Sequence, residues 1–273
     1  MNSVPHAFFK NVGHLLRSYK EIFYCKNLSH LSQLTFPLGP ICKQIEKKAL
    51  SLEFYVAANC DEVYFSMKEE ETYLKSVPTD WNRWEVNRIS AYGIKDWQYQ
   101  NRQPLDIQTF NALLKISRNS FCPTGVCFFN GNYNLPKNLI LLLRELPRIK
   151  TLTSYQIQNE QFGPLTMQAI RRGTLKGICL VSAKVDSEIL DHLINWIKTP
   201  GFGWFYLRLH SYSALKEDEF YGKIWEAGRY LVKQGKRIKA NMNNSRKASY
   251  PEFEFSSYSS YSGPLHYAAL ELL

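Results

Sequence analysis

The chain has 273 residues, of which 45% are hydrophobic and 14% aromatic, so one large core or two small ones can be buried. Charged residues make up 21%, which argues against a mostly disordered chain, and the net charge of +10 permits an acidic partner without identifying it. No apolar run reaches the ~20 residues that cross a bilayer, and no secretory pattern opens the chain, so we expect no membrane partner and a cytoplasmic or nuclear location.

Residues 1–40 are predicted to form a small helical segment. Pro5 suits a first helical turn, and apolar residues recur at helical spacing from Phe8 to Leu34. A cluster of Pro and Gly residues at 37–40 ends the segment.

Residues 41–120 are predicted to form a β-rich region that a helix closes. The runs 51–57 and 62–67 are typical of strands, and the residues between them favour a turn, so a β-hairpin is expected. Residues 84–92 alternate as a third strand does. Asp106 is the expected N-cap of the closing helix.

Residues 121–244 repeat one pattern of short apolar run, turn, amphipathic helix and Gly or Pro stop. Two runs, which start at Leu175 and Trp204, fit the L-x-x-L-x-L spacing of leucine-rich repeats and begin about 29 residues apart, within the usual repeat length. Strand centres are expected near residues 127, 151, 178, 206 and 239. Asp186 is the predicted N-cap of the helix at 187–198.

These patterns predict an α/β fold: a leucine-rich-repeat-like parallel β/α solenoid with a small helical N-terminus and a β-hairpin region. The alternative is an ordinary open α/β sheet with crossovers on both faces. Residues 245–273 are interpreted as a Ser/Tyr-rich tail. Its run 256–263 is expected to be mobile, whereas Leu270 and Leu272 are able to dock back.

No nucleotide-binding loop, nucleophile elbow, metalloprotease helix or kinase signature is present, so we predict a non-enzymatic protein without cofactor. The C-x4-C spacing of Cys122 and Cys127 has no second Cys/His pair, so no metal site is expected. His192 is interpreted as a solvated helix residue, and capping accounts for Asp186.

Basic residues gather at the helix-to-strand junctions. If the units stack, these junctions form one basic rim of Arg144, Arg148, Lys150, Arg171, Arg172, Lys176, Lys198, Lys233, Lys236, Arg237 and Lys239. Charges at helix C-termini complement the macrodipole, which accounts for many of them. The functional interpretation is a docking edge, and the candidate contact residues are Arg171, Arg172, Lys176, Lys236 and Arg237, with Arg208 and His210 at a strand end.

The opening of the chain resembles an F-box. Val4-Pro5 stands where that motif begins with an apolar–Pro pair, Phe8 and the apolar residues to Leu34 follow in short helices, and Cys25-Lys26 matches a late Cys-basic step. An F-box-like start ahead of leucine-rich-like repeats resembles the large nematode expansions of F-box proteins. The resemblance implies that residues 4–36, including Val4, Pro5 and Phe8, bind a Skp1-type adaptor and that the repeats select a protein for ubiquitination.

The sequence therefore predicts a protein-recognition module, a candidate substrate-selecting subunit of a ubiquitin ligase. Two alternatives stay open. The first is a basic-rim binder of nucleic acid or of a phosphate-bearing partner, which is less favoured because the basic rim carries no interleaved aromatic residues. The second is an enzyme on an ordinary α/β sheet.

Overall fold

The computed structural model describes residues 48–57, 62–69, 72–94, 102–120, 123–129, 135–155, 162–183, 185–209, 217–241, 249–255 and 268–273. Several predictions concern residues outside these ranges: the helical segment 1–40 with Val4, Pro5 and Phe8, the turn of the hairpin, His210 and the run 256–263.

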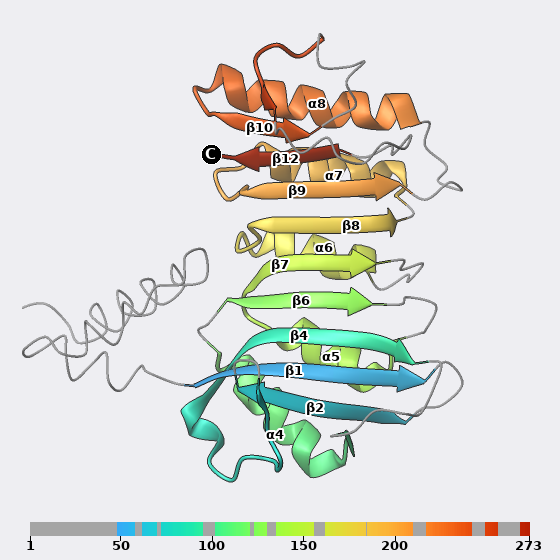
Figure 1. Ribbon diagram of the computed structural model, residues 1–273, viewed down its shortest axis with the longest axis vertical. Helices are drawn as coiled ribbons and strands as arrows, with labels where there is room; N and C mark the ends of the chain where they lie inside the picture. The colour runs from blue at the N-terminus through green and yellow to red at the C-terminus, as the bar shows by residue number, and fades with distance from the viewer. Residues whose placement is uncertain are drawn as a thin grey trace, which may run out of the picture.

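One twelve-stranded sheet runs through the molecule. Its strands are β1 (Lys48–Ala57), β2 (Val63–Glu69), β3 (Thr72–Tyr73), β4 (Trp84–Ile94), β5 (Gln103–Pro104), β6 (Thr124–Phe129), β7 (Ile149–Tyr155), β8 (Gly177–Ala183), β9 (Trp204–Leu209), β10 (Ile238–Asn241), β11 (Glu254–Phe255) and β12 (Ala268–Leu272). Their spatial order is β11-β10-β12-β9-β8-β7-β6-β4-β1-β2-β3, and β5 pairs with β2 (Figure 1).

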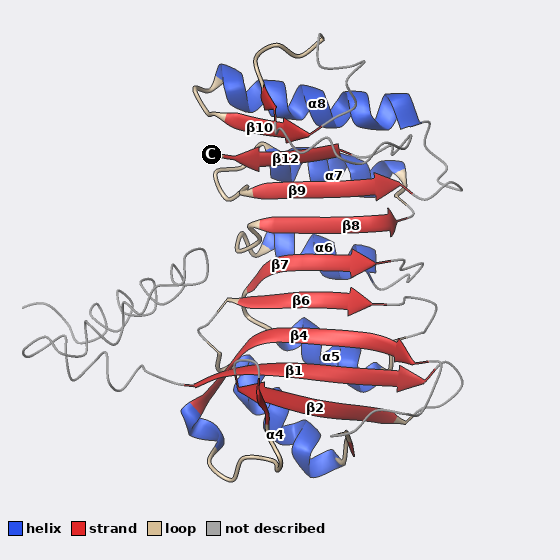
Figure 2. Cartoon of the chain, in the orientation of Figure 1, coloured by secondary structure: helices blue, strands red, loops and turns tan. Residues whose placement is uncertain are grey.

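The helices of the described residues cover one face of this sheet, and Figure 2 shows the strands in front of them. They are a short 3-10 helix (Trp81–Arg83), α4 (Ile107–Arg118), α5 (Lys137–Glu145), α6 (Phe162–Arg171), α7 (Ser187–Ile197) and α8 (Glu217–Lys233). Consecutive helices from α4 to α8 contact one another, so they form a second layer. We call the side of the sheet that no described helix covers the open face.

The predicted stacking of strand–helix units is confirmed for the middle of the chain. The strands pair in parallel in the series β4, β6, β7, β8 and β9, whereas β5, which lies between β4 and β6 in the sequence, pairs with β2. After each strand, a helix brings the chain back to the end of the sheet at which the parallel strands begin, which parallel pairing requires. The α/β prediction holds, and the helices of the described residues do not lie on both faces as the alternative sheet required.

The hairpin prediction also holds. β1 pairs antiparallel with β2, and on its other side it pairs in parallel with β4. Because β4 in turn pairs with β6, hydrogen bonds join the β-rich region and the repeat region in a single sheet.

The placement of the last predicted strand was wrong. The expectation set the strand near residue 239 beside the strand near 206, but β12 lies between β9 and β10 and is antiparallel to both. Leu270 docks back as the sequence allowed, and its side chain is 1% exposed. A strand from the tail region therefore completes the sheet interior.

Alternation along the strands separates the two faces of the sheet. Leu52 and Phe54 in β1 and Ile178 and Leu180 in β8 are at most 1% exposed and face the helices. Apolar side chains of the helices pack against them, and one face of α8 is buried at Phe220, Ile224, Ala227 and Leu231. The core therefore lies between the sheet and the helix layer.

Local signals set the helix ends. The carboxylates of Asp106 and Asp186 accept hydrogen bonds from the backbone N–H groups of Thr109 and Ile189, at 2.7 and 2.8 Å, so both predicted N-caps are confirmed. Gly173 follows α6 with φ of 69°, a conformation that favours glycine.

Candidate functional site

Four aromatic rings form a ladder across the open face. Tyr55, Tyr92, Phe129 and Tyr155 lie on β1, β4, β6 and β7 and are neighbours in register. Successive ring centres are 5.4, 4.8 and 5.2 Å apart, and the ring planes differ by 18°, 8° and 10°. We call these four residues the aromatic ladder.

The rings of the aromatic ladder stack face against face, so their edges point away from the sheet. Ring edges carry partial positive charge and suit electronegative partner atoms. Tyr55 is 8% exposed and Tyr155 is 39% exposed, so the ladder becomes more accessible toward β7. Burial raises the pKa of Tyr92 and of Tyr155, and both hydroxyls therefore keep their protons as hydrogen-bond donors at neutral pH.

The Tyr55 end of the ladder is closed by a cation and anchored by a carboxylate. The Arg102 guanidinium carbon lies 3.6 Å from the centre of the Tyr55 ring. The Tyr55 hydroxyl donates to Glu53 Oε2 at 2.7 Å. These contacts fix the ring on which the rest of the ladder stacks.

Glu53 is the centre of a polar cluster at this end of the sheet. Lys68 Nζ lies 2.8 Å from Oε1, and the hydroxyls of Tyr73 and Ser66 donate to Oε2 at 3.0 and 3.3 Å. Burial by itself raises the pKa of Glu53, but the hydrogen bonds from Lys68 and Tyr55 and the charge of Lys68 outweigh it, so the pKa lies below the usual 4.5. Glu53 therefore stays ionised within a satisfied network.

Beside the ladder runs a strip of small, half-buried side chains. Cys127, Thr153 and Cys179 occupy neighbouring positions on β6, β7 and β8, two residues before the ladder row. Burial raises the pKa of the Cys179 thiol to about 11, so the thiol is protonated and weakly reactive at neutral pH. We call these three residues the small-residue strip.

Trp204 lies on the sheet at the far side of the strip. A Cβ atom added to Gly177 would come 2.1 Å from the indole ring, so the ring rests directly over this glycine. The absent side chain of Gly177 thus lets a large aromatic ring cross from β9 onto β8. The indole is partly exposed and adds an aromatic surface to the open face.

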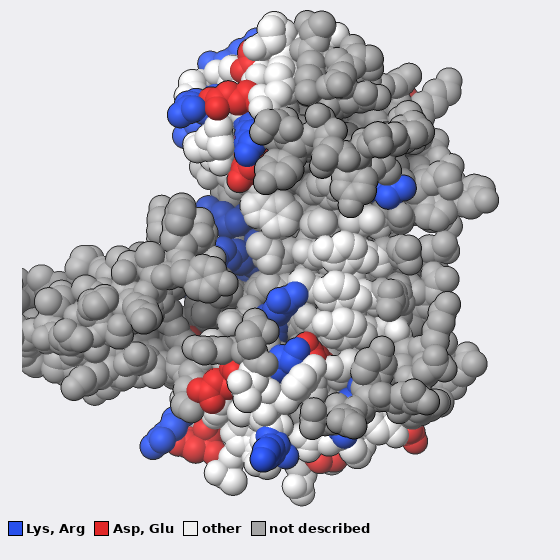
Figure 3. Space-filling view, in the orientation of Figure 1, with Lys and Arg blue, Asp and Glu red and all other residues white. Residues whose placement is uncertain are grey.

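Two exposed guanidinium groups flank these features. Arg88 on β4 contacts the Cys127 thiol at 3.8 Å, and Arg208 on β9 lies at the end of the ladder row, beyond Val181. Neither arginine forms an ion pair within the described residues. In Figure 3 the middle of this face shows Lys and Arg around an uncharged area, while Asp and Glu gather toward the upper and lower parts of the molecule.

The predicted basic rim lies at a different place, the edge where the parallel strands begin. Two of its candidate residues make contacts within the fold. Arg172 donates to the backbone carbonyls of Arg144, at 3.0 Å, and of Leu146, and Arg237 pairs with Glu254 at 2.7 Å. Both arginines therefore already contact groups of the fold.

Three other candidates of the rim stay on the surface. Arg171, Lys176 and Lys236 are exposed and form no ion pair with any described residue. Arg208, in contrast, lies on the open face near the end of β9 and not on the rim. Within the described ranges, the structure thus divides the predicted contact residues between two surfaces.

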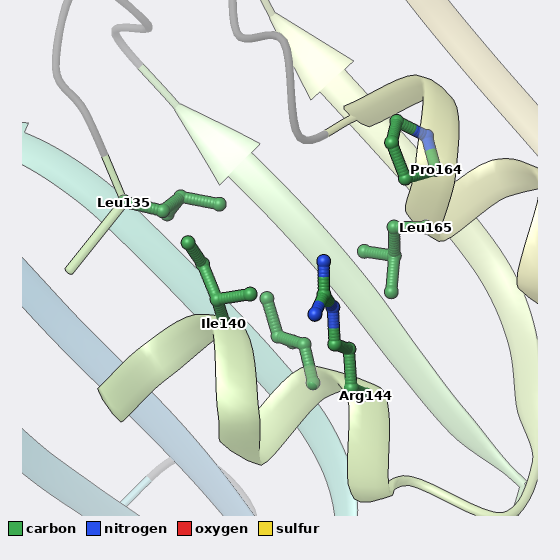
Figure 4. Close-up of a pocket in the computed structure, with 6 residues that line it drawn as sticks. Leu135, Ile140, Arg144, Pro164 and Leu165 are labelled. Atoms are coloured by element: carbon green, nitrogen blue, oxygen red, sulfur yellow. The ribbon is translucent and has the colours of Figure 1, made fainter. Parts of the chain in front are cut away.

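A shallow pocket lies on the helix side, between α5 and α6. It holds about 250 Å³ of space, including open solvent, and is lined by Leu135, Ile140, Leu143, Arg144, Pro164 and Leu165. Figure 4 shows the Arg144 guanidinium between Ile140 and Leu165. One cation in a shallow apolar depression offers no set of converging polar groups for chemistry.

Within the described ranges, no three His, Cys, Asp or Glu side chains come together as metal ligands. No described helix combines the length and the hydropathy needed to span a membrane.

The aromatic ladder was not predicted from the sequence, although a signal was present. Each of four strands carries an aromatic residue at an outward position near its end, and the ladder appears once these strands are aligned at that position. The position of the Trp204 ring over Gly177 had no signal in the sequence, because it depends on the pairing of these two residues in β8 and β9.

A comparison of the chain with models of known protein families, with curated proteins and with solved structures finds no match.

Proposed function

We propose that the chain is a non-enzymatic protein-recognition module that holds its partner against the open face. The observation that carries this proposal is the aromatic ladder, which presents ring edges across four parallel strands, with the tyrosine hydroxyls of β4 and β7, on a face that no described helix covers. Aromatic residues with a polar tip are enriched where proteins contact one another.

The stacking of the rings favours a protein over a single-stranded nucleic acid on this face. Bases bind to aromatic side chains through their flat surfaces. In the ladder the flat surfaces of Tyr55, Tyr92 and Phe129 are covered by neighbouring rings and, at Tyr55, by Arg102, so that only Tyr155 has a flat surface with no ring stacked on it within the described residues. Ring edges and hydroxyls remain, and these suit carbonyl and carboxylate oxygens of a polypeptide.

The same surface is the basis for proposing a leucine-rich-repeat-like solenoid. In such folds each repeat adds one strand to a parallel sheet and returns on the other side, which leaves the strand face for a partner. The units from β6 to β9 follow this order, with their helices on one side. Capping by terminal units would then fall to the strands β12, β10 and β11 at one end and to the β1–β2 hairpin at the other.

The partner-capture experiment compares two tryptophan variants of the intact chain. Thr153→Trp places bulk in the middle of the small-residue strip, whereas Leu141→Trp places it on the exposed side of α5, where Leu141 is 40% exposed. We expect Thr153→Trp to lose the partners that affinity purification recovers with the wild type, and Leu141→Trp to keep them. Recovery that is equal for both folded variants would contradict recognition by the open face.

We further propose that the module selects substrates for a ubiquitin ligase, with residues 4–36 binding a Skp1-type adaptor. The support is the F-box-like opening of the chain. A purified adaptor should be retained by the wild type and lost on Pro5→Ala with Phe8→Ala. Failure of the wild type to retain it removes the ligase role and leaves recognition by the open face in place.

The second candidate function, a nucleic-acid or phosphate binder, uses the other surface. Its support is that Arg171, Lys176 and Lys236 are exposed and form no ion pair within the described part of the chain. Salt-sensitive retention on heparin or RNA that falls on Arg171→Glu with Lys176→Glu would favour this function.

A further inference from the structure

The charges of the open face define the chemistry of its partner. Strands β6, β7 and β8 contain no Asp or Glu, and they lie between Arg88 on β4 and Arg208 on β9. Glu53 is already bound by Lys68 and three hydroxyls. Glu271 lies beyond this area, on β12 next to Trp204 in the register. The middle of the face is therefore uncharged, and an arginine flanks it on each side.

The positions of the two arginines set a length. Four strand spacings separate β4 from β9, which is roughly 19 Å at ~4.8 Å per strand. Arg88 precedes the ladder row by four residues, and Arg208 lies in that row, which adds roughly 13 Å along the strands. The diagonal between the two is roughly 23 Å, the span of about seven residues of extended chain.

The surface along this diagonal accepts a flat, extended ligand. It passes the small-residue strip, where Cys127, Thr153 and Cys179 are half buried and rise little above the strands. The hydroxyl of Tyr155 lies on one side of this path and the indole of Trp204 on the other. Hydrogen-bond donors and an aromatic surface are thus available between the two cations.

We propose that the open face binds an extended acidic segment of a partner protein, with two carboxylates about seven residues apart at Arg88 and Arg208 and a large apolar side chain between them against Trp204. This inference rests on the proposed function, because it specifies the partner of the same surface. Charge complementarity between partner carboxylates and two guanidinium groups without ion pairs in the described chain carries it.

The test begins with a display library of random 12-residue peptides. Peptides are selected on the intact wild-type chain and counter-selected on the Thr153→Trp variant, so that binders of other surfaces are removed. The expected consensus carries Asp or Glu at two positions six to eight residues apart, with an aromatic or large aliphatic residue between. A consensus without acidic residues, or no enrichment at all, overturns the inference.

The consensus peptide is then titrated against charge-reversal variants. Arg88→Glu and Arg208→Glu should each weaken binding at least tenfold, and raising the salt from 50 to 500 mM should weaken it further. Arg171→Glu is the matched control on the rim and should leave affinity unchanged. Equal loss with Arg171→Glu, or tighter binding of a single-stranded RNA of the same charge, overturns the inference.

The two proposals fail in different ways. If protein partners are still lost with Thr153→Trp but the selected peptides lack paired carboxylates, recognition by the open face stands and the acidic ligand is wrong. If neither peptides nor proteins respond to Thr153→Trp, both proposals are wrong.

Discussion

Gly177 and Glu53 are two residues of the open face whose immediate surroundings determine their contribution to stability. Gly177 has no side chain, and the Trp204 indole occupies the space in which one would stand. Glu53, by contrast, is stabilised by what surrounds it, because four side chains satisfy its two oxygens. Two predictions follow from these environments.

The first concerns Gly177→Ala. The new Cβ would meet the Trp204 ring at 2.1 Å, so the indole must move, and we expect a loss of about 1–3 kcal/mol in the free energy of unfolding. Urea unfolding with a shift in tryptophan fluorescence measures both effects. Gly222→Ala in α8 is the control: its Cβ meets nothing within 4 Å, and alanine should stabilise the helix by about 0.5–1 kcal/mol.

The second concerns pH. Because the pKa of Glu53 is lower in the folded chain than the usual 4.5, its ionised form stabilises the fold above that value, and this stabilisation is lost as the pH falls through the folded pKa. Glu53→Gln should cost about 1–3 kcal/mol at pH 7. The difference from the wild type should shrink between pH 5 and pH 3 in urea titrations. A constant difference across this range would contradict the role given to the charge.

Whole elements differ in how far the local sequence determines them. The helix α7 begins where Asp186 can accept from the N–H of Ile189, and both residues lie within one turn, so the sequence sufficed to place it. The position of β12 depends on contacts with residues more than sixty positions earlier in β9 and about thirty positions earlier in β10. No local pattern contains that information, and the sequence therefore placed β10 beside the wrong neighbour.

The aromatic ladder was not predicted because its signal, one outward aromatic residue near the end of each strand, can be recognised only once the strands are aligned. The strands that hold Tyr92, Phe129 and Tyr155 were expected, but a ladder requires their register and the face to which each ring points. The basic rim was predicted from junctions that are local, yet Arg172 and Arg237 find partners that are distant in sequence. Local sequence patterns thus predicted the helices and strands, whereas the pairing of distant segments determines which side chains form a site.

The contact between the end of α6 and the end of α5 should contribute to stability. Arg172 donates to two carbonyls at the end of α5, so Arg172→Met should lower the free energy of unfolding by about 1–2 kcal/mol. Arg171→Met is the matched control, because Arg171 is exposed, and it should change stability by less than about 0.5 kcal/mol. Equal midpoints of urea unfolding for the two variants would rule out this role.

A further prediction concerns the contribution of β12 to the stability of the core. Leu270 is 1% exposed and lies against Gly228 of α8, so Leu270→Ala should cost about 2–4 kcal/mol. Glu271 is its exposed neighbour on the other face of the strand, and Glu271→Ala should be nearly neutral. Chemical unfolding of both variants tests whether β12 contributes to the core. A neutral Leu270→Ala would show that it does not.

At the scale of the whole molecule, one sheet joins regions that the sequence suggested as separate. β4 pairs with β6, and α4 contacts α5, so backbone hydrogen bonds and side-chain packing both cross the expected boundary near residue 120. The β-rich region and the repeats share one core cluster.

This continuity predicts a single unfolding transition for the sheet. Far-UV circular dichroism and tryptophan fluorescence should give the same urea midpoint, because neither region can unfold without exposing buried side chains of the other. Two separated midpoints would show that β1, β2 and β4 unfold independently of the repeats.

The insertion of β12 has a consequence for synthesis of the chain. Translation proceeds at roughly 5–20 residues per second, so β9 leaves the ribosome about 3–12 seconds before β12 does. During that interval β9 and β10 each have a free hydrogen-bonding edge where the missing strand will later lie. The nascent chain therefore passes through a period in which a chaperone, or another unfinished copy, can occupy the gap before the chain's own strand arrives.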